Sequence, residues 1–361
     1  MGFRVLAAVL VLVRAPLSAG PRPAAGRMPR VGRSRIGLLG LLMMLALGLP
    51  DAPFVEAQRD RKMAQIGVLM AGAPSVTRSY VEGFEQGLRE LGYRKSENVS
   101  VEYHYLEGTV DEFRGAAAEL VRARVDVIVA WGTSATTGAK LATRTVPIIG
   151  VAVGDPVGTH LISALTKPGG NITGLSNMSA ELSTKQLNLL KELLPRLTYV
   201  AVLRNPTNPV SDSELNWTSV AARRLQMQLQ LIDVRSPDGL EAAFSAAIKE
   251  KVGAMTVLAD PMFLSHRAQI ADLAVKSRLP TTFNWRQYVE AGGLLAYGPN
   301  LEEMWRRAPT FIDKILKGTK PADLPFEQPT KFELEINMKT AKTLGLTVPA
   351  SLLLQADRVI N

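Results

Sequence analysis

Two short polar loops follow apolar runs between residues 125 and 157, and their residue types suit hydrogen bonding to a small polar ligand. The run Val125–Ala130 leads to Gly132-Thr133-Ser134, and the run Ile148–Val153 leads to Gly154-Asp155-Pro156. Each run predicts a buried parallel strand. In an open α/β sheet, ligands bind beyond the carboxyl ends of the strands, where helix N-termini leave N–H donors free. The alternative is that Gly-Thr-Ser and Asp-Pro form only turns and helix caps.

The same order of strand, polar loop and helix recurs along the chain. In the first half, strands are expected at 65–70, 99–105, 125–130, 148–153 and 172–175, with helices at 79–91, 110–123, 135–141 and 182–194. A second series has strands at 199–203, 229–234, 254–258 and 280–283, with helices at 211–226, 240–250 and 262–275. This alternation is typical of a doubly wound parallel sheet. Two such halves imply two lobes with a cleft between them, where small ligands usually bind.

Further elements remain after the two complete halves. A strand at 294–297, a helix at 301–316, a Pro-rich linker at 317–329, a strand at 330–337 and a short helix at 338–344 follow in order. These spare elements indicate that the chain returns to the first lobe and then crosses to the second again.

The composition is that of a folded protein without cysteine chemistry. Of the 361 residues, 47% are hydrophobic and 21% are charged, and there is no cysteine. The length favours two domains. The lack of cysteine excludes disulfides, thiolate metal sites, cysteine nucleophiles and a lipid-modified N-terminal cysteine.

No sequence motif supports an enzyme. None of the predicted strands is followed by G-x-G-x-x-G, and neither G-x-x-x-x-G-K-[ST] nor G-x-S-x-G occurs. The three histidines, His104, His160 and His266, lack the spacing of metal ligands. We therefore expect no catalytic activity, no metal and no cofactor.

The N-terminal 57 residues resemble an export signal. Arg30, Arg33 and Arg35 precede the apolar run Ile36–Leu49, and Val55 and Ala57 occupy the positions typical before a cleavage point. The run is short for a membrane span, although an uncleaved anchor is the alternative. We expect a signal peptide at 1–57 and a mature protein in the periplasm that is not a lipoprotein.

The charge of the leader accounts for much of the basic character of the chain. Residues 1–57 carry seven arginines and two acidic residues, so the formal net charge of +9 falls to +4 for the remainder. No run of basic and aromatic residues follows residue 62. We therefore expect no nucleic acid partner.

From residue 64 to residue 360 the sequence resembles the substrate-binding proteins of ABC transporters, in the group whose members bind tryptophan or tyrosine. The resemblance rests on IGVLM (66–70), GTSAT (132–136), VPIIGVAVGDPVG (146–158), PGGNITGLS (168–176), NP (205–206), DP (260–261), AGGLLAYGPN (291–300), the segment 315–346 and AD-x-V-I (356–360). It implies an α/β fold of the type I periplasmic binding protein: two Rossmann-like lobes with parallel sheets, joined by a three-strand hinge.

The resemblance also implies the organisation and function of the chain. Lobe 1 is expected at 58–176 plus 286–328, and lobe 2 at 177–285 plus 329–361. The protein is expected to capture a small molecule, an amino acid and by resemblance an aromatic one, by closing the hinge. Its partner would be a membrane permease with a cytoplasmic ATPase subunit, and the protein itself is expected to be a monomer. A periplasmic receptor that feeds a signalling protein instead of a permease is the alternative.

The expected ligand site combines donors and acceptors at strand ends of both lobes. Gly132, Thr133 and Ser134 would donate to a ligand carboxylate, and Asp155, beside Pro156, and Asp260 would accept from an ammonium group. Asn205, Asn284 and Tyr297 would add neutral hydrogen bonds, and Tyr80, Phe263 or Trp285 would form an aromatic wall. For the two Asp-Pro pairs, helix capping is the alternative role, and one Asp can do both. Phe84, Leu88 and Trp131 are expected to pack in the core.

Overall fold

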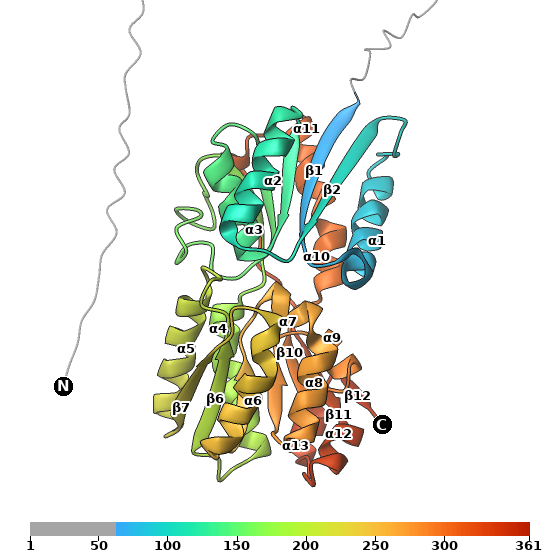
Figure 1. Ribbon diagram of the computed structural model, residues 1–361. Coiled ribbons are helices and arrows are strands. Elements are labelled where there is room, and N and C mark those ends of the chain that lie inside the picture. Colours follow the sequence, from blue (N-terminus) through green and yellow to red (C-terminus); the bar gives the residue numbers. More distant parts are fainter. Residues whose placement is uncertain (1–62) are drawn as a thin grey trace, which may run out of the picture. The chain divides into compact units, whose positions relative to one another are not determined.

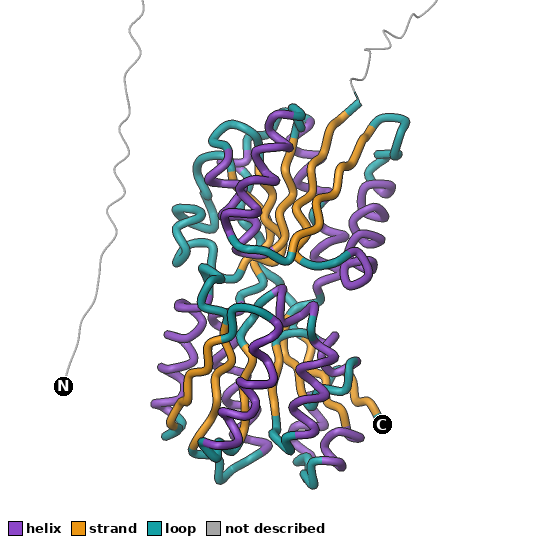
Figure 2. Tube along the Cα trace, viewed as in Figure 1, coloured by secondary structure: helices purple, strands orange, loops and turns teal. Residues whose placement is uncertain are grey.

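The computed structural model describes residues 63–361, which belong to one compact unit, Asp60–Asn361. The expected signal peptide at residues 1–57 lies outside the described residues. Within the described part, two sheets form the centres of two lobes, with helices on both faces of each sheet (Figures 1 and 2). The expectation of two α/β lobes is confirmed.

The first sheet is parallel throughout and has the order β2-β1-β3-β4-β5. Its strands are β1 (Ala64–Ala71), β2 (Val99–Leu106), β3 (Val127–Trp131), β4 (Ile148–Val153) and β5 (Ile172–Ser176). Strands β3, β4 and β5 are buried along their whole length, because helices cover both faces of the sheet. This burial explains why these segments are continuous apolar runs and do not alternate.

The first three helices of the first lobe each follow one of the strands β1, β2 and β3. They are α1 (Pro74–Glu90), α2 (Val110–Arg122) and α3 (Gly132–Ala142). Helix α1 begins at Pro74, five residues earlier than expected, because proline is favoured in the first turn. It buries Tyr80, Phe84 and Leu88 on one face. Helix α3 begins directly at Gly132, so the expected polar loop 132–134 is its first turn.

The second sheet has seven strands in the order β12-β11-β10-β9-β8-β6-β7. They are β6 (Tyr199–Arg204), β7 (Gln228–Asp233), β8 (Ala254–Val257), β9 (Thr281–Phe283), β10 (Leu295–Gly298), β11 (Glu333–Asn337) and β12 (Arg358–Ile360). Strands β10 and β11 are antiparallel, and the other neighbours are parallel. The antiparallel pair arises because β11 enters this lobe from the first lobe.

The remaining helices follow β5, and several of them have eight residues or fewer. They are α4 (Ser179–Leu193), α5 (Ser211–Arg224), α6 (Leu240–Lys249), α7 (Pro261–Ser265), α8 (Arg267–Lys276), α9 (Arg286–Glu290), α10 (Leu301–Arg307), α11 (Pro309–Leu316), α12 (Met338–Thr343) and α13 (Ala350–Gln355), with 3-10 turns at Pro237–Gly239 and Pro321–Asp323. The helix expected at 301–316 is divided into α10 and α11, because Pro309 begins a new helix. Both helices pack on α1 of the first lobe.

The chain passes between the lobes three times. The first connection is residues 177–178 between β5 and α4, the second is residues 299–300 between β10 and α10, and the third is residues 328–332 before β11. Glu327 is held at the edge of the first sheet, where its carbonyl accepts from the Ser176 amide and its amide donates to the Gly174 carbonyl. Residues 286–298, which we expected in lobe 1, instead supply β10 to the second sheet and helix α9, which packs on β10 and β11.

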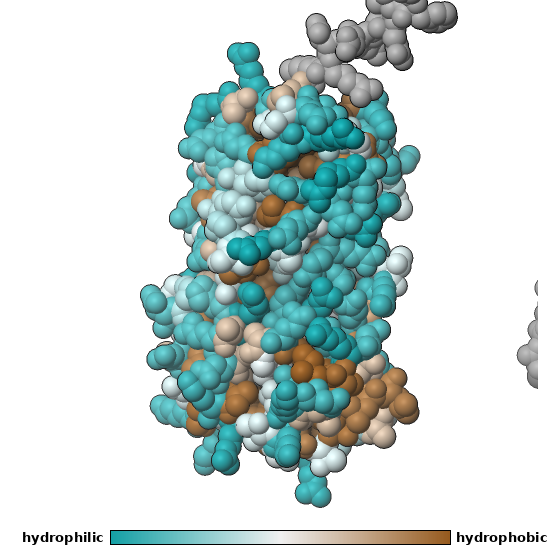
Figure 3. Space-filling view, turned by 90° about the vertical axis from the view of Figure 1, so that its right-hand side faces the viewer, coloured by the Kyte–Doolittle hydropathy of each residue, from teal (hydrophilic) through white to brown (hydrophobic). Residues whose placement is uncertain are grey.

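On the face of the molecule shown in Figure 3, apolar surface is concentrated on the second lobe. In Figure 3 the upper part of the surface is mostly hydrophilic, and the larger apolar areas lie in the lower part. Leu354 on α13 has the highest exposed fraction of the large hydrophobic residues in the described part, 87%. The surface where the two lobes meet is therefore not the most apolar face in this view.

Candidate functional site

The two lobes approach each other closely at glycines that follow the strands of the first sheet. Gly72 follows β1, Gly132 begins α3 after β3, and Gly154 follows β4. A Cβ atom on Gly154 would lie 2.4 Å from Val210 Cγ2, and one on Gly72 would lie 2.8 Å from the Ser265 hydroxyl oxygen. Both neighbours belong to the second lobe. The strand ends of the first sheet therefore pack directly against the second lobe in this structure.

A cavity of about 330 Å³ lies beside this contact and is lined by both lobes. The first lobe contributes Ala71, Gly72, Leu106, Glu107, Gly108, Thr109, Glu112, Phe113 and Ser134, and the second contributes Asn205, Thr207, Arg235, Asp260, Pro261, Met262 and Ser265. We call this space the interlobe cavity. Its volume is at the lower end of the range for small-molecule sites.

Asp260 is the most strongly organised acid of the interlobe cavity. It is 4% exposed, and its Oδ1 caps helix α7 by accepting from the amides of Met262 (2.9 Å) and Phe263 (3.3 Å). Its Oδ2 accepts from the side-chain amides of Asn208 (2.9 Å) and Asn205 (3.2 Å). Burial raises the pKa of Asp260 to about 6, although these four hydrogen bonds act in the opposite direction. Asp260 therefore caps a helix and also lines the cavity.

Glu214 on α5 is buried beneath Asp260. It is 1% exposed, and its Oε2 accepts from the amide of Ala259 at 3.0 Å, while its Oε1 has no hydrogen-bond partner among residues 63–361. Burial is the main cause that raises the pKa of Glu214 to about 8, and the nearby charge of Asp260 adds to it. Glu214 is thus mostly protonated at neutral pH and leaves Asp260 as the main buried negative charge here.

The raised pKa of Glu214 predicts how stability depends on pH. The unfolded carboxyl ionises near pH 4.5, so between about pH 4.5 and 8 the unfolded chain binds fewer protons and stability falls as pH rises. Glutamine is neutral at every pH. We therefore compare Tm of Glu214→Gln with Tm of the unchanged protein in thermal unfolding. The Tm of the variant minus that of the unchanged protein should increase by at least about 3 °C from pH 5 to pH 8. A constant difference in Tm would contradict the raised pKa.

Three of the expected site residues line the interlobe cavity: Ser134, Asn205 and Asp260. Gly132 and Thr133 instead line a much smaller space of about 10 Å³ between the lobes, together with Trp131 and Trp285. The Thr133 hydroxyl accepts from the Gly154 amide at 3.1 Å and so fixes the loop after β4. A space of this size holds about one water molecule.

Asp155 differs from the expectation that it faces a ligand ammonium. Its Oδ1 accepts from the Gly158 amide at 2.8 Å, and its Oδ2 accepts from the hydroxyl of Ser213, on α5 of the second lobe, at 2.6 Å. Asp155 and the adjacent Pro156 do not line the interlobe cavity. Asp155 therefore links the two lobes in this structure.

Asn284 and Tyr297 also lie outside the lining of the interlobe cavity. Asn284 is buried, donates to the Val257 carbonyl at 2.8 Å and accepts from the Gln186 amide at 2.9 Å. The Tyr297 ring packs near Phe332, with the ring centroids 6.0 Å apart. The contacts of both side chains are within the second lobe and the segment that leads into it.

The expected aromatic residues are buried close to the meeting point of the lobes. Tyr80 is 2% exposed, and its ring meets that of Trp131 edge-on with centroids 5.0 Å apart. Phe263 is fully buried, and Trp285 is 4% exposed. Trp131 packs in the core, as expected. None of Tyr80, Phe263 and Trp285 is part of the lining of the interlobe cavity.

Three charged residues that line the interlobe cavity were not predicted from the sequence: Glu107, Glu112 and Arg235. Glu107 directly follows β2, and Arg235 lies two residues beyond β7. Both are exposed, and neither forms a hydrogen bond or an ion pair with another described residue through its side chain. The signal was the same as for Asp260, a polar residue near the carboxyl end of a parallel strand, but it was applied only to other strands.

The cavity thus presents opposite charges from different elements. Asp260 offers a buried carboxylate, and Arg235 offers a guanidinium group that carries no partner. Such a pair suits a ligand with an ammonium and a carboxylate group. Among residues 63–361 there is no group of three or more side chains arranged to hold a metal ion.

The architecture and the interlobe cavity define a two-lobed solute-binding protein of the type I periplasmic fold. A family model described as ABC transporter substrate binding protein matches residues 66–360, and the chain belongs to this family. A tyrosine-binding protein of Clostridioides difficile is 24% identical over 315 residues, which cover 86% of this chain and 90% of that protein.

Solved structures agree with this family. An ABC domain from Streptococcus pneumoniae in complex with L-Trp is 28% identical and superposes with a TM-score of 0.77, covering 82% of this chain and 99% of that one. A conserved domain protein from Vibrio cholerae is 26% identical, with a TM-score of 0.78 over 82% of this chain and all of that one. The protein is therefore a substrate-binding protein of an ABC transporter, a family that binds small molecules and works with a permease. Between residues 63 and 361, no helix has the length and apolar character of a membrane span.

Proposed function

We propose that the chain is the periplasmic component of an ABC importer and captures an amino acid in the interlobe cavity. The observation that carries this proposal is that buried Asp260 and the exposed Arg235, which has no side-chain partner among the described residues, line the same cavity between the lobes. Asp260 would accept from the ligand ammonium, and Arg235 would bind its carboxylate. Amino acids that carry an aromatic side chain are the first class to test, because a tyrosine-binding protein and an L-Trp complex are among the relatives.

Capture would proceed by closure of the lobes around the ligand. Residues 177–178, 299–300 and 328–332 would form the hinge, and Ser134 on one lobe would face Asn205 and Asp260 on the other. A ligand that contacts both lobes favours the closed form by the difference between its affinities for the two forms. The closed form would then dock, as a monomer, on the permease.

A thermal-shift screen of the twenty amino acids and their deaminated analogues tests the proposal, because ligand binding raises Tm by mass action. We expect at least one amino acid to raise Tm and its analogue without the amine to have little effect. Calorimetry on the hit then gives affinity and stoichiometry. A screen in which sugars or simple carboxylic acids raise Tm and no amino acid does would contradict the proposed ligand class.

Arg235 provides a further test of the ligand carboxylate. We expect Arg235→Gln to weaken binding of the amino acid by about three- to tenfold in calorimetry, since a charge-assisted hydrogen bond is lost at an exposed position. The matched control is Arg224→Gln, which removes an exposed arginine of α5 that does not line the interlobe cavity. Equal affinities of the two variants would remove Arg235 from the site.

A further inference from the structure

A second cavity, of about 510 Å³, lies where the chain passes between the lobes and is larger than the interlobe cavity. Its walls are the end of α1, the end of β5, helices α10 and α11, and the connecting segments around residues 299–300 and 327–331. We call it the hinge cavity. It contains none of the residues of the interlobe cavity.

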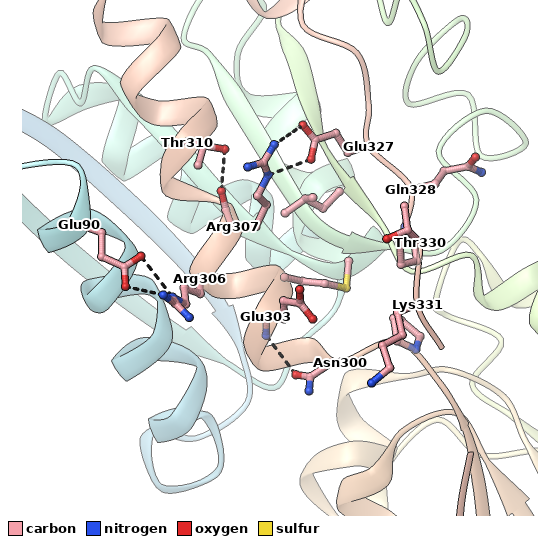
Figure 4. Close-up of a pocket in the computed structure, with 14 residues that line it drawn as sticks. Glu90, Asn300, Glu303, Arg306, Arg307, Thr310, Glu327, Gln328, Thr330 and Lys331 are labelled. Carbon is pink, nitrogen blue, oxygen red and sulfur yellow. Dashed lines mark hydrogen bonds and ion pairs between the residues drawn. The ribbon is translucent and has the colours of Figure 1, made fainter. Parts of the chain in front are cut away.

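Two ion pairs fix part of the hinge cavity wall. The Arg307 guanidinium donates to both carboxylate oxygens of Glu327, each at 3.1 Å, and the Arg306 guanidinium donates to Glu90 at 2.7 Å. In Figure 4 both guanidinium groups are turned toward these partners. Four of the six lining charges are therefore already neutralised by one another.

The other two lining charges, Glu303 and Lys331, are not held in this way. The Glu303 carboxylate has no hydrogen bond or ion pair with another described residue; only the Glu303 amide is bonded, to Asn300. The Lys331 ammonium forms only a long ion pair with Glu333, at 3.9 Å, and its side chain is 67% exposed, so a ligand carboxylate can compete for it at little cost. Figure 4 shows both side chains beside the cavity. Glu303 is therefore the lining charge without a hydrogen bond or ion pair to another described residue, and Lys331 is held only by a long, exposed ion pair.

The apolar part of the lining completes a site of mixed character. Leu175, Met304, Pro299 and Pro329 contribute apolar surface, and Gln328 and Thr330 contribute neutral polar groups. A ligand with a charged group at each end and a short hydrocarbon between them would match both the charges and this apolar surface.

We propose that the hinge cavity is a second ligand site that takes a small zwitterion, with its ammonium at Glu303 and its carboxylate at Lys331. Pro299, Asn300 and residues 328–331 line the cavity and also belong to the second and third connections between the lobes. A bound zwitterion therefore changes the free energy of lobe closure and, through it, the affinity of the interlobe cavity. Only this coupling rests on the proposed function; binding at the hinge cavity does not.

Calorimetric titration of the full chain with β-alanine, 4-aminobutyrate and 6-aminohexanoate tests the site, because these zwitterions differ in charge separation. We expect one of them to bind with one-to-one stoichiometry and to bind at least fivefold more weakly to Glu303→Gln and to Lys331→Gln. Asp260→Asn, in the interlobe cavity, should leave this binding unchanged. Glu250→Gln and Lys320→Gln are the matched controls, because they remove exposed charges outside both cavities.

Three outcomes would overturn the second site. The first is that none of the three zwitterions binds at concentrations up to about 20 mM, which is about twenty times a Kd of 1 mM. The second is binding that Asp260→Asn abolishes and Glu303→Gln does not, which would place the probe in the interlobe cavity. The third is equal binding of butylamine and butyrate, which would show that two charged ends are not recognised.

Coupling between the two cavities is tested separately, by repeating the amino acid titration with the zwitterion present. An unchanged affinity for the amino acid would refute the coupling.

Discussion

Gly154→Ala is expected to weaken ligand binding at least tenfold, about 1.4 kcal/mol. The added methyl group would lie 2.4 Å from Val210 Cγ2 and 2.8 Å from the Ser179 hydroxyl oxygen, and both atoms belong to the second lobe. Gly154 has no positive φ, so alanine is tolerated by the backbone. The substitution therefore opposes the contact between the lobes without straining the first lobe itself. Calorimetry would give the affinity, and small-angle scattering would show a more open molecule.

The control for this variant is Gly115→Ala. Gly115 lies in α2, and a Cβ atom there would meet no atom within 4 Å. This change should leave affinity unaltered and raise stability by about 0.5–1 kcal/mol, because alanine is the better helix former. If Gly154→Ala bound ligand as tightly as Gly115→Ala, the contact seen at Gly154 would not be part of the ligand-bound form.

Asp260→Asn is expected to lower affinity for the amino acid at least tenfold, about 1.4 kcal/mol, and to affect its deaminated analogue much less. The carboxylate is the proposed partner of the ligand ammonium, and an amide cannot supply the negative charge. The amide oxygen can still accept from Met262 and Phe263, so the cap of α7 is retained. Calorimetry with the matched pair of ligands separates this charge effect from a general loss of structure, which would weaken both ligands alike.

The pKa of Asp260 predicts a further property of the same interaction. Because its pKa is about 6 in the free protein, protonation below that pH removes the charge that the ammonium needs. Affinity for the amino acid should therefore fall by up to about tenfold for each pH unit below 6 and level off above it. The Asn variant should lack this dependence. A pH profile shared by both proteins would show that another group is responsible.

The sequence predicted the lobes well because strand, loop and helix leave local signals. The buried run of β4 and the spacing of Tyr80, Phe84 and Leu88 depend only on which faces are covered. Asp260-Pro261 was also predictable, since Asp caps the helix that Pro begins. These features are decided within a few residues of the chain.

The composition of the interlobe cavity was only partly predictable, because it depends on contacts between distant segments. Asn284 follows β9 as expected, but its side chain bonds Val257 and Gln186 inside the second lobe. Asp155 meets Ser213 across the lobes, 58 residues away. Arg235 and Glu107 are exposed residues that become part of a site only because two strand ends come together. Local patterns contain no information on that meeting.

The return of the chain to the first lobe at the second connection determines when that lobe can be completed during synthesis. Helices α10 and α11 bury Trp305, Phe311 and Ile312, and the Glu327 backbone bonds the edge of β5, yet these residues follow β5 by more than 120 positions. A nascent chain that has emerged only as far as residue 298 would still expose the apolar surface beneath α1. Synthesis of the first lobe therefore begins first, but its fold cannot be completed until most of the second lobe has been synthesised. Chaperone contact should therefore persist until residue 327 leaves the ribosome.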